Sequence, residues 1–303
     1  MPILSKRNGE TDMRLPPILN RLCSGTNDRD PLSPLARPST QPVATMPVRT
    51  ASPDDSLAQY LAQRARDNRA VSPSSRRVLE RATEAVEAVR KQIPMRGNVT
   101  TDLAQTERQA AYRLHAVRFS VSANVRERLN TSNMQSPRGL RQTVLTAASA
   151  RIVGAGNCNE FQSAVLLEAG KRLQPGERLV AMETDARDHT FVQMESKRRD
   201  GTTRVVVLDA WANGPAVLAE DCAYAQHAPK PRASQVANRD DARRADRIAA
   251  TLVKQHNQDE ASLKQLKASI EGRAQRDIPS GILFEEQHVT RRLPPRPDET
   301  PES

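Results

Sequence analysis

Apolar residues recur at helical spacing along the stretch between residues 74 and 173. This spacing predicts four helices, over Ser74–Ile93, Thr101–Asn130, Ser136–Ala150 and Cys158–Leu173. Pro94 follows the first helix and Pro137 stands in the first turn of the third, two places where proline is compatible with a helix end. The segment Gly154-Ala155-Gly156-Asn157 breaks the chain before the fourth helix.

After residue 173, apolar and polar residues alternate instead, which predicts β-strands. His189–Ser196 and Thr202–Ala210 are two of them, and Arg178–Glu183 is a third that would pair with the His189 strand. A charged helical stretch, a surface or hairpin-forming helix, follows over Asp240–Arg273. The sequence therefore predicts an α+β fold. In it, a helical N-terminal part and the helix that begins at Cys158 pack on a small antiparallel sheet with further strands.

Both ends of the chain are richer in proline and polar residues than the stretch between them. Nine of the 21 prolines fall within residues 1–53, mixed with Ser, Thr and Arg and without an apolar period. Little surface could be buried there to offset the entropy lost on ordering. We therefore expect a disordered leader over 1–53, a helical N-terminal region over 54–150, a second folded region over 151–290 and a disordered tail over 291–303.

The formal net charge is +10, but its distribution argues against a nucleic-acid-binding module. Residues 150–225 contain 9 Lys and Arg against 11 Asp and Glu, whereas such a module concentrates basic residues on its folded face. We expect no nucleic-acid partner. No apolar run approaches the ~18–20 residues of a membrane-spanning helix. A Sec-type signal peptide is not expected, and Pro2 after Met1 argues against an N-myristoyl anchor.

Three cysteines are too few, and an odd number, for a disulfide framework, and they indicate a reducing compartment. Cys158 has the setting of a nucleophile, because the N–H groups at a helix start favour the reactive thiolate. The glycine-rich break before it would let a substrate backbone approach closely. The alternative is a small buried hydrophobic residue. Cys23 falls in the leader, and Cys222 falls in a predicted helix after Trp211.

His189 begins one predicted strand, where it could act as general base and acid, and Asp209 ends the apolar run of the next. The hairpin register decides whether they meet. A two-residue turn would put them on opposite faces. A three-residue loop over 199–201, with Gly201 left-handed, pairs position 189 with 211 and 209 with 191. The two side chains are then diagonal neighbours, and Asp209 could orient the imidazole toward Cys158.

A zinc site would be a competing use of these residues. No second Cys or His stands at a short ligand spacing, so we expect no metal and no other cofactor. The remaining histidines occur singly and are expected to be surface or structural: His115, His227, His256 and His288. Asn157 and Trp211 are the side-chain candidates for oxyanion donors, beside the backbone N–H of Cys158. Asp188 competes with Asp209 as orienting group, but its adjacency to His189 would turn it to the opposite face.

The order of Cys, then His on one strand, then Asp on the next resembles the papain/transglutaminase-like fold. Three segments are more narrowly similar to the AvrPphE/HopX/XopE family of type III secreted effectors from plant-pathogenic bacteria. They are Gly156-Asn157-Cys158-Asn159-Glu160, Asp188-His189 and Leu208-Asp209-Ala210-Trp211-Ala212-Asn213-Gly214-Pro215-Ala216. The resemblance extends over about residues 70–275, and its specific motifs lie within 154–221.

The resemblance implies a catalytic triad of Cys158, His189 and Asp209 and a thiol-dependent acyl transfer, either protease-like or transglutaminase-like, on host immune proteins. It further implies a type III secretion signal in the leader, a secretion chaperone as partner and a place in the host cytosol, nucleus or membrane periphery. The alternative is a non-catalytic effector that binds host proteins and retains the fold. Helices and charged surfaces would support that function equally well.

Overall fold

The computed structural model describes residues 56–184, 189–198, 200–225, 231–274 and 283–290 of the 303-residue chain. These segments belong to one compact unit. The leader predicted over 1–53, the tail predicted over 291–303, Cys23, Asp188 and His227 lie outside the described residues. Among the helices that the structure describes, none is long and apolar enough to cross a membrane.

The helices fall largely where the apolar spacing predicts them. The helix predicted over 74–93 is confirmed as Pro73–Gln92; its first turn is capped by the Ser72 hydroxyl, which accepts from the N–H of Ser75 (3.3 Å). The helix predicted at Cys158 is also confirmed. The described α-helices are α2 (Leu57–Arg66), α3 (Pro73–Gln92), α4 (Thr100–Gln105), α5 (Gln109–Ala116), α6 (Ser122–Thr131), α7 (Arg141–Val153), α8 (Cys158–Gly170), α9 (Arg239–Asn257) and α10 (Glu260–Ala274).

The single helix predicted over 101–130 is wrong. The chain breaks after α4, where Glu107 and Arg108 have left-handed φ angles of 47° and 66°. The hydroxyl of Thr106 donates to the carbonyl of Asp102 (2.7 Å) and accepts from the N–H of Ala110 (3.2 Å), so it replaces backbone hydrogen bonds of a continuous helix. A π-helical turn, η2 (Val117–Val121), then joins α5 to α6.

Three smaller expectations also need correction. The helix predicted from Ser136 begins at Arg141, because Pro137 accepts from the N–H of Leu140 in a separate turn (3.0 Å). The charged stretch over 240–273 is two helices, and the second starts where the Asp259 carboxylate accepts from the N–H of Ala261 (3.1 Å). Cys222 is extended and follows a short 3₁₀ turn, η4 (Ala219–Asp221), rather than lying in a helix.

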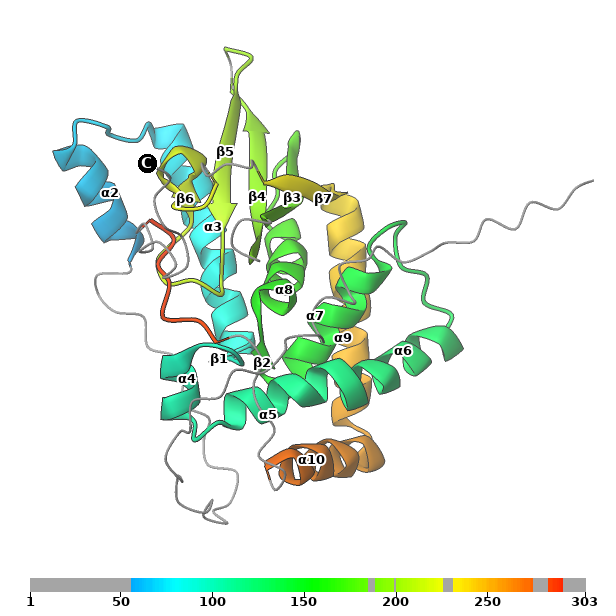
Figure 1. The fold of residues 1–303 in the computed structure, drawn as a ribbon. Helices are drawn as coiled ribbons and strands as arrows, with labels where there is room; N and C mark the ends of the chain where they lie inside the picture. The colour runs from blue at the N-terminus through cyan, green and yellow to red at the C-terminus, as the bar shows by residue number, and fades with distance from the viewer. Residues whose placement is uncertain (1–55, 185–188, 199, 226–230, 275–282, 291–303) are drawn as a thin grey trace, which may run out of the picture. The chain divides into compact units, whose positions relative to one another are not determined.

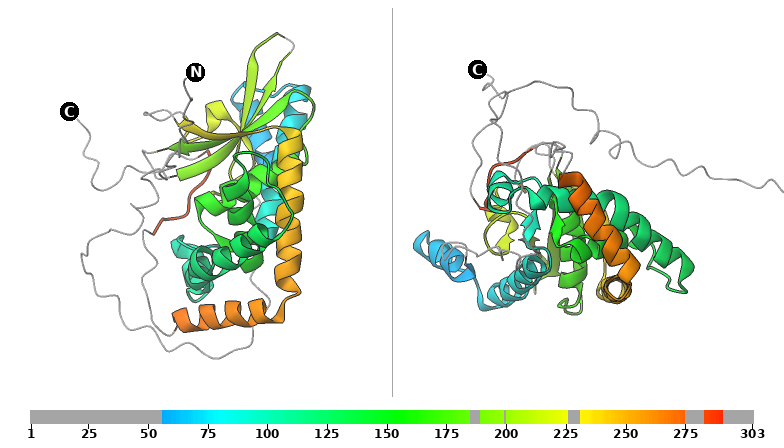
Figure 2. Two further views of the ribbon diagram at one scale, coloured as in Figure 1. Left: turned by 90° about the vertical axis from the view of Figure 1, so that its right-hand side faces the viewer. Right: turned by 90° about the horizontal axis from the view of Figure 1, so that it is seen from below.

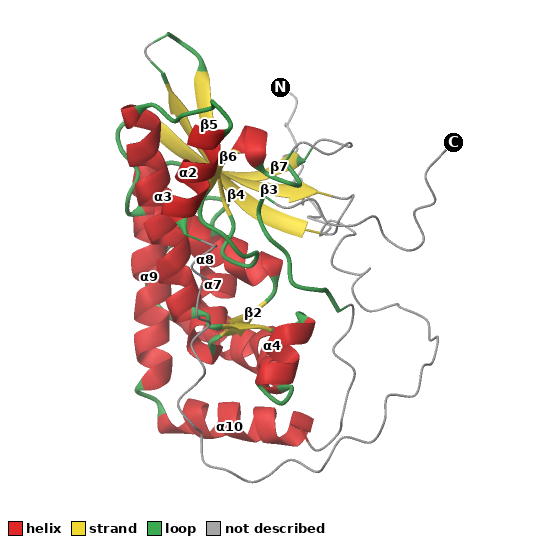
Figure 3. Cartoon of the chain, turned by 90° about the vertical axis from the view of Figure 1, so that its left-hand side faces the viewer, coloured by secondary structure: helices red, strands yellow, loops and turns green. Residues whose placement is uncertain are grey.

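A five-stranded antiparallel sheet forms the β part of the fold, so the α+β class is correct (Figure 1). The predicted pairing of the third strand with the His189 strand is confirmed, and two strands are additional. In spatial order the strands are β6 (Val217–Leu218), β5 (Thr203–Leu208), β4 (His189–Lys197), β3 (Glu177–Thr184) and β7 (Arg232–Ala237). A separate parallel pair, β1 (Met95–Arg96) with β2 (Ala155–Gly156), lies among the helices (Figure 3).

Helix α8 is the centre of the core. It packs against β3 and β4 on one side and is surrounded by α3, α7 and α9, while α3 also contacts β5 (Figure 1). From Glu160 to Gly170 every residue of α8 is buried. Residues from both predicted folded regions join one hydrophobic cluster, so the helical N-terminal part and the sheet share a single core.

The segment 283–290, here called the C-terminal strap, crosses from the β1–α4 corner toward β6 (red in Figure 1). Phe284 donates to the carbonyl of Asn98 (2.8 Å), and its own carbonyl accepts from Thr100 (3.0 Å). Further along, Val289 donates to the carbonyl of Asn213 (2.9 Å) and is fully buried. The strap thus binds together segments that are distant in the sequence.

At the far end of α9, where α10 turns away (Figure 2), His256 is buried with an exposed fraction of 1%. Neither ring nitrogen has a hydrogen-bond partner among the described residues. Burial, reinforced by the nearby Arg128 charge and opposed by Asp259, lowers the pKa of His256 below its usual value of 6.5. The folded protein therefore holds this imidazole neutral where an unfolded chain would begin to charge it.

We expect His256 to contribute a drop in unfolding free energy as the pH falls from about 7 to about 5, because the unfolded state takes up a proton at His256 and the folded state does so only at lower pH. His189, with its raised pKa, contributes in the opposite direction equally in wild type and in a His256 variant. Each pKa unit of lowering costs up to about 1.4 kcal/mol at low pH. His256→Leu should reduce the drop, measured by urea unfolding at both pH values. Equal drops in the two proteins would assign the acid sensitivity to other groups.

Candidate active site

Cys158 is the first residue of α8, and the β1–β2 pair fixes the chain that leads into it. Gly156 is needed there, because a Cβ at this position would approach the Glu160 side chain to 2.7 Å. Glu160 is buried and accepts from the N–H of Asn157 (2.8 Å), which caps the helix start. Arg118 pairs with the same carboxylate (3.3 Å). The Cys158 side chain itself is half-buried.

The β4–β5 hairpin has the register that a three-residue loop predicts. Val192 pairs with Leu208 and Gln193 with Val207, which extrapolates to 189 opposite 211 and 191 opposite 209. Gly201 is left-handed, with φ of 81°. His189 and Asp209 consequently share a face, and His189 Nε2 lies 2.7 Å from Asp209 Oδ2.

Asp209 is buried and accepts four hydrogen bonds. The backbone N–H groups of Trp211 (2.9 Å) and Ala212 (3.1 Å) donate to Oδ1. Oδ2 accepts from His189 Nε2 and from the hydroxyl of Tyr224. Burial would raise the pKa of Asp209, but the His189 charge and these hydrogen bonds outweigh it and lower the pKa below its usual value. The carboxylate is thus held ionised without contact with water.

The imidazole of His189 has an exposed fraction of 5% and is enclosed by aromatic rings. Its ring centroid is 5.1 Å from that of Trp211 and 4.8 Å from that of Tyr224, which stands edge-on. The Cys158 side chain contributes a hydrogen bond and a charge interaction to the same imidazole. Because Nε2 faces Asp209, the nitrogen left for the sulfur is Nδ1.

Burial alone would lower the pKa of His189. The charge of Asp209, the hydrogen bond to it and the contact with Cys158 more than offset this effect and raise the pKa to about 10. His189 is therefore an imidazolium at neutral pH. A cation next to a cysteine sulfur favours the thiolate form, which is the nucleophilic form.

Two arginines from the N-terminal part hold the loop that carries Asp209. Arg90, on α3, donates to the backbone carbonyls of residues 209, 210, 212 and 214, over distances of 2.6–3.3 Å. Arg96, on β1, is buried and donates to the carbonyl of Trp211 (3.4 Å) and to Asn213 Oδ1 (3.5 Å). The position of the loop that carries Asp209 therefore depends on arginines that lie about 120 positions earlier in the sequence.

The two side-chain oxyanion candidates differ from expectation. The indole N–H of Trp211 donates to Asn98 Oδ1 (3.2 Å) and its backbone N–H donates to Asp209, so Trp211 packs beside the imidazole with both N–H groups engaged. Asn157 stands next to Cys158, but its Oδ1 is buried without a partner among the described residues. Asn157 is also the N-cap residue of α8, where its side chain and that of Glu160 form a capping box.

Sequence reasoning missed four residues of this site: Tyr224, Arg90, Arg96 and Asn98. Tyr224 was visible only as one more aromatic residue, and the arginines only as two of many basic residues. The three histidines described outside the site stand apart from it in role: His115 stacks on Phe119 (4.3 Å), His256 is the buried imidazole of α9, and His288 belongs to the C-terminal strap. Among the described residues, no group of three or more metal-ligating side chains converges.

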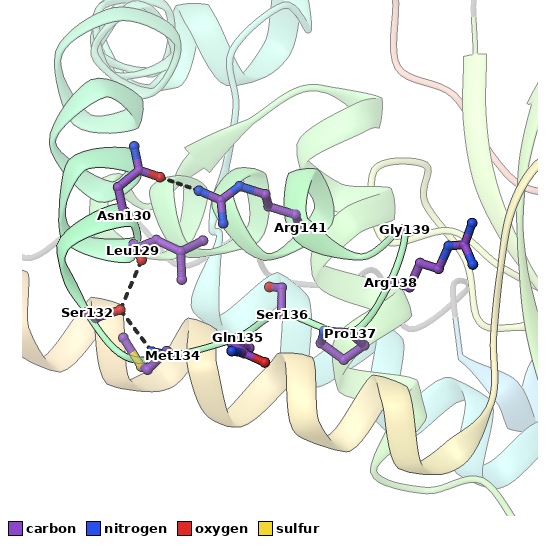
Figure 4. A pocket seen from close by; sticks show the side chains of 10 residues that line it. All are labelled: Leu129, Asn130, Ser132, Met134, Gln135, Ser136, Pro137, Arg138, Gly139 and Arg141. Carbon is purple, nitrogen blue, oxygen red and sulfur yellow. Dashed lines mark hydrogen bonds between the residues drawn. The ribbon is translucent and has the colours of Figure 1, made fainter. Parts of the chain in front are cut away.

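A surface hollow at the α6–α7 connection is separate from these residues (Figure 4). It is lined by residues within Leu129–Arg141, among them Asn130, whose amide oxygen accepts from Arg141. None of its lining residues comes from the start of α8, from β4 or from the loop after β5. The hollow therefore has no part in the Cys158–His189–Asp209 arrangement.

No family model, no curated protein and no solved structure matches the chain in the comparisons. The function therefore has to be argued from the geometry described above.

Proposed function

We propose that the protein is a cysteine acyltransferase, in which Cys158 is the nucleophile, His189 the general base and acid, and Asp209 the orienting carboxylate. The observation that carries the proposal is the 2.7 Å contact between His189 Nε2 and Asp209 Oδ2 in a buried setting, with Cys158 bonded to the same imidazole. Nucleophile, base and orienter in hydrogen-bond sequence are the signature of covalent acyl transfer.

The chemistry divides into two half-reactions. The Cys158 thiolate attacks the carbonyl carbon, a C–S bond forms, and the C=O electron pair moves to oxygen. The oxyanion then collapses, the bond to the leaving amine breaks, and the His189 imidazolium gives that amine its proton. In the second half, water or another amine attacks the thioester carbon and loses a proton to His189. The second oxyanion then collapses, the C–S bond breaks, and the Cys158 thiolate leaves beside the His189 imidazolium. Water gives hydrolysis or deamidation, and an amine gives a crosslink.

We further propose that this is the papain/transglutaminase-like variant of an α+β fold and that the chain is an AvrPphE/HopX/XopE-type effector acting on host immune proteins in plant cells. The order of the three motifs supports this assignment, as does the position of the nucleophile at the start of a helix packed on an antiparallel sheet. The leader as a secretion signal and a secretion chaperone as partner belong to the same proposal.

The first test is alkylation of purified full-length protein with iodoacetamide at about pH 6 and pH 8, mapped by mass spectrometry to each cysteine. At pH 6 an ordinary thiol, with a pKa of about 8.5, is almost entirely protonated and slow. We expect Cys158 to react at least about tenfold faster than free N-acetylcysteine at pH 6, because a sulfur hydrogen-bonded to a positioned imidazole is an activated nucleophile. His189→Ala should remove this advantage.

Cys222 is the internal control, because burial raises its pKa to about 12 and it should stay unlabelled in the folded protein. Should Cys158 instead react like N-acetylcysteine at both pH values, and be indifferent to the His189 substitution, the acyltransferase proposal fails. A non-catalytic protein that binds host proteins would then take its place.

A further inference from the structure

We infer that the side-chain amide of Asn98 is the oxyanion donor of this site, with its Nδ2 aimed at the carbonyl oxygen that Cys158 attacks. The inference rests on the proposed acyl transfer and adds a catalytic residue to it. Neither the motifs nor the spacing of the sequence singles out Asn98, which stands 60 residues before the nucleophile.

The parallel β1–β2 pair brings Asn98 to the level of Cys158. Met95 pairs with Ala155 and Arg96 with Gly156, and the N–H of Gly97 continues the ladder by donating to the Gly156 carbonyl (2.9 Å). Two residues past the Arg96–Gly156 pair, one chain reaches Asn98 and the other reaches Cys158. Asn98, in the turn after β1, and Cys158, the first residue of α8, therefore follow the same end of this short ladder.

Gly97 and Asn98 form a turn directly after β1, and this turn leaves Arg96 and Asn98 both within reach of Trp211. Arg96 reaches the carbonyl of Trp211, and Asn98, two positions on, reaches the indole of the same Trp211. Asn98 therefore points toward the loop that carries Asp209, and its partner Trp211 lies against the His189 imidazole, 5.1 Å between ring centroids. The amide and the imidazole thus flank one indole ring.

The hydrogen bond from Trp211 fixes which way the amide faces. An indole N–H only donates, so the atom that receives it must be the carboxamide oxygen. The Nδ2 group is then directed away from the indole, and no described residue supplies an acceptor for it, although Asn98 is only 5% exposed. Fully buried polar atoms without a partner do occur in the described residues, but Asn98 Nδ2 is not one of them. Because Nδ2 has no partner among these residues and is not fully buried, it is accessible to a small group.

The backbone of Asn98 is held on both sides, as an oxyanion donor requires. Its carbonyl accepts from Phe284 of the C-terminal strap (2.8 Å), and the Phe284 ring packs edge-on against Trp211 (5.6 Å). A donor that is already oriented needs no reorganisation when charge develops on the carbonyl oxygen. Asn157, the other amide near the sulfur, is the N-cap residue of α8, and its side chain belongs to the capping box at the helix start.

The test compares two reactions of Cys158 in full-length protein. Iodoacetamide alkylates the sulfur by displacing iodide and forms no oxyanion, whereas p-nitrophenyl acetate acylates it through a tetrahedral oxyanion and releases p-nitrophenolate. Asn98→Asp keeps an acceptor for the Trp211 indole and loses the donor. The added negative charge acts on the thiolate in both reactions, so we compare the ratio of acylation to alkylation rates.

We expect Asn98→Asp to lower this ratio by about 10²–10³-fold, the loss typical of one oxyanion donor. Asn98→Ala should lower it similarly. Asn124→Asp is the matched control, because it makes the same change on α6, where the amide donates to Ser262 (3.1 Å). Far-UV circular dichroism reports whether Asn98→Asp retains the fold, because the emission of Trp211 would respond directly to the changed group at its indole N–H.

Each outcome has a distinct meaning. A lowered ratio in Asn98→Asp but not in Asn124→Asp, with an unchanged circular dichroism spectrum, supports the donor role. A ratio equal to that of wild type, in protein whose Cys158 acylates rapidly, overturns the role of Asn98 and leaves the acyltransferase proposal standing. If wild-type Cys158 neither acylates nor alkylates faster than a free thiol, the proposed function fails and the donor role fails with it.

Discussion

Asp209→Asn is expected to lower the rate of Cys158 acylation by about 10⁴-fold, the size of effect that an orienting carboxylate has in such triads. Trp211 and Ala212 donate to Oδ1, so the asparagine oxygen should stay on that side and its NH₂ should face His189. The amide would then donate to Nε2 and force the imidazole proton onto Nδ1, the nitrogen that faces the sulfur. That tautomer cannot take a proton from Cys158.

The rate is measured as the release of p-nitrophenolate from p-nitrophenyl acetate, with circular dichroism to show that the variant is folded. Asp200→Asn is the matched control: Asp200 is an exposed carboxylate in the turn of the same hairpin, bonded to Thr202 (2.6 Å), and its replacement should leave the rate unchanged. Retention of more than about a tenth of the rate in Asp209→Asn would remove Asp209 from the orienting role.

Arg96→Met is expected to cost about 3–5 kcal/mol of unfolding free energy, because it leaves the buried carboxylate of Asp102 without its cation. Asp102 is buried, and both its oxygens accept from Arg96, one of them from the backbone N–H (2.8 Å) and the other from Nε (3.0 Å). The same guanidinium holds the carbonyl of Trp211. Acylation of Cys158 should therefore fall together with stability.

Urea unfolding followed by Trp211 emission measures the change. Arg96→Met combined with Asp102→Asn should recover part of the loss, since no unpaired charge then remains buried. Arg76→Met breaks an exposed pair with Glu80 (2.9 Å) and should cost no more than about 1 kcal/mol. If Arg96→Met behaves like Arg76→Met, the β1 arginine has no structural role of this kind.

The sequence was sufficient for the local parts of the site. The position of Cys158 follows from a glycine break before a helix, and the meeting of His189 with Asp209 follows from the length of one hairpin loop. Both depend on interactions over about 20 positions or fewer, where side-chain periodicity and turn geometry act directly. The break at Glu107 was harder, because the Thr106 hydroxyl that competes with the helix leaves the apolar spacing intact.

The parts that could not be predicted depend on pairs far apart in the sequence. Arg90 contacts backbone carbonyls, and any chain segment offers carbonyls, so no pattern in residues 209–214 points back to it. Asn98 meets Trp211 only because a two-residue parallel pair forms between β1 and β2. Such short ladders have no periodicity of their own to detect.

The C-terminal strap has a consequence for how the Cys158–His189–Asp209 arrangement assembles during folding. Arg96 and Glu286 are joined across 190 positions, and Asn98 and Trp211 across 113, so loops of that length must close before the site exists. Closure of long loops costs entropy before any contact repays it, and chains rich in such contacts fold slowly. The proposed acylation of Cys158 should therefore require the completed chain topology, and we expect an excised fragment that lacks residues 90–102 or the strap not to show it.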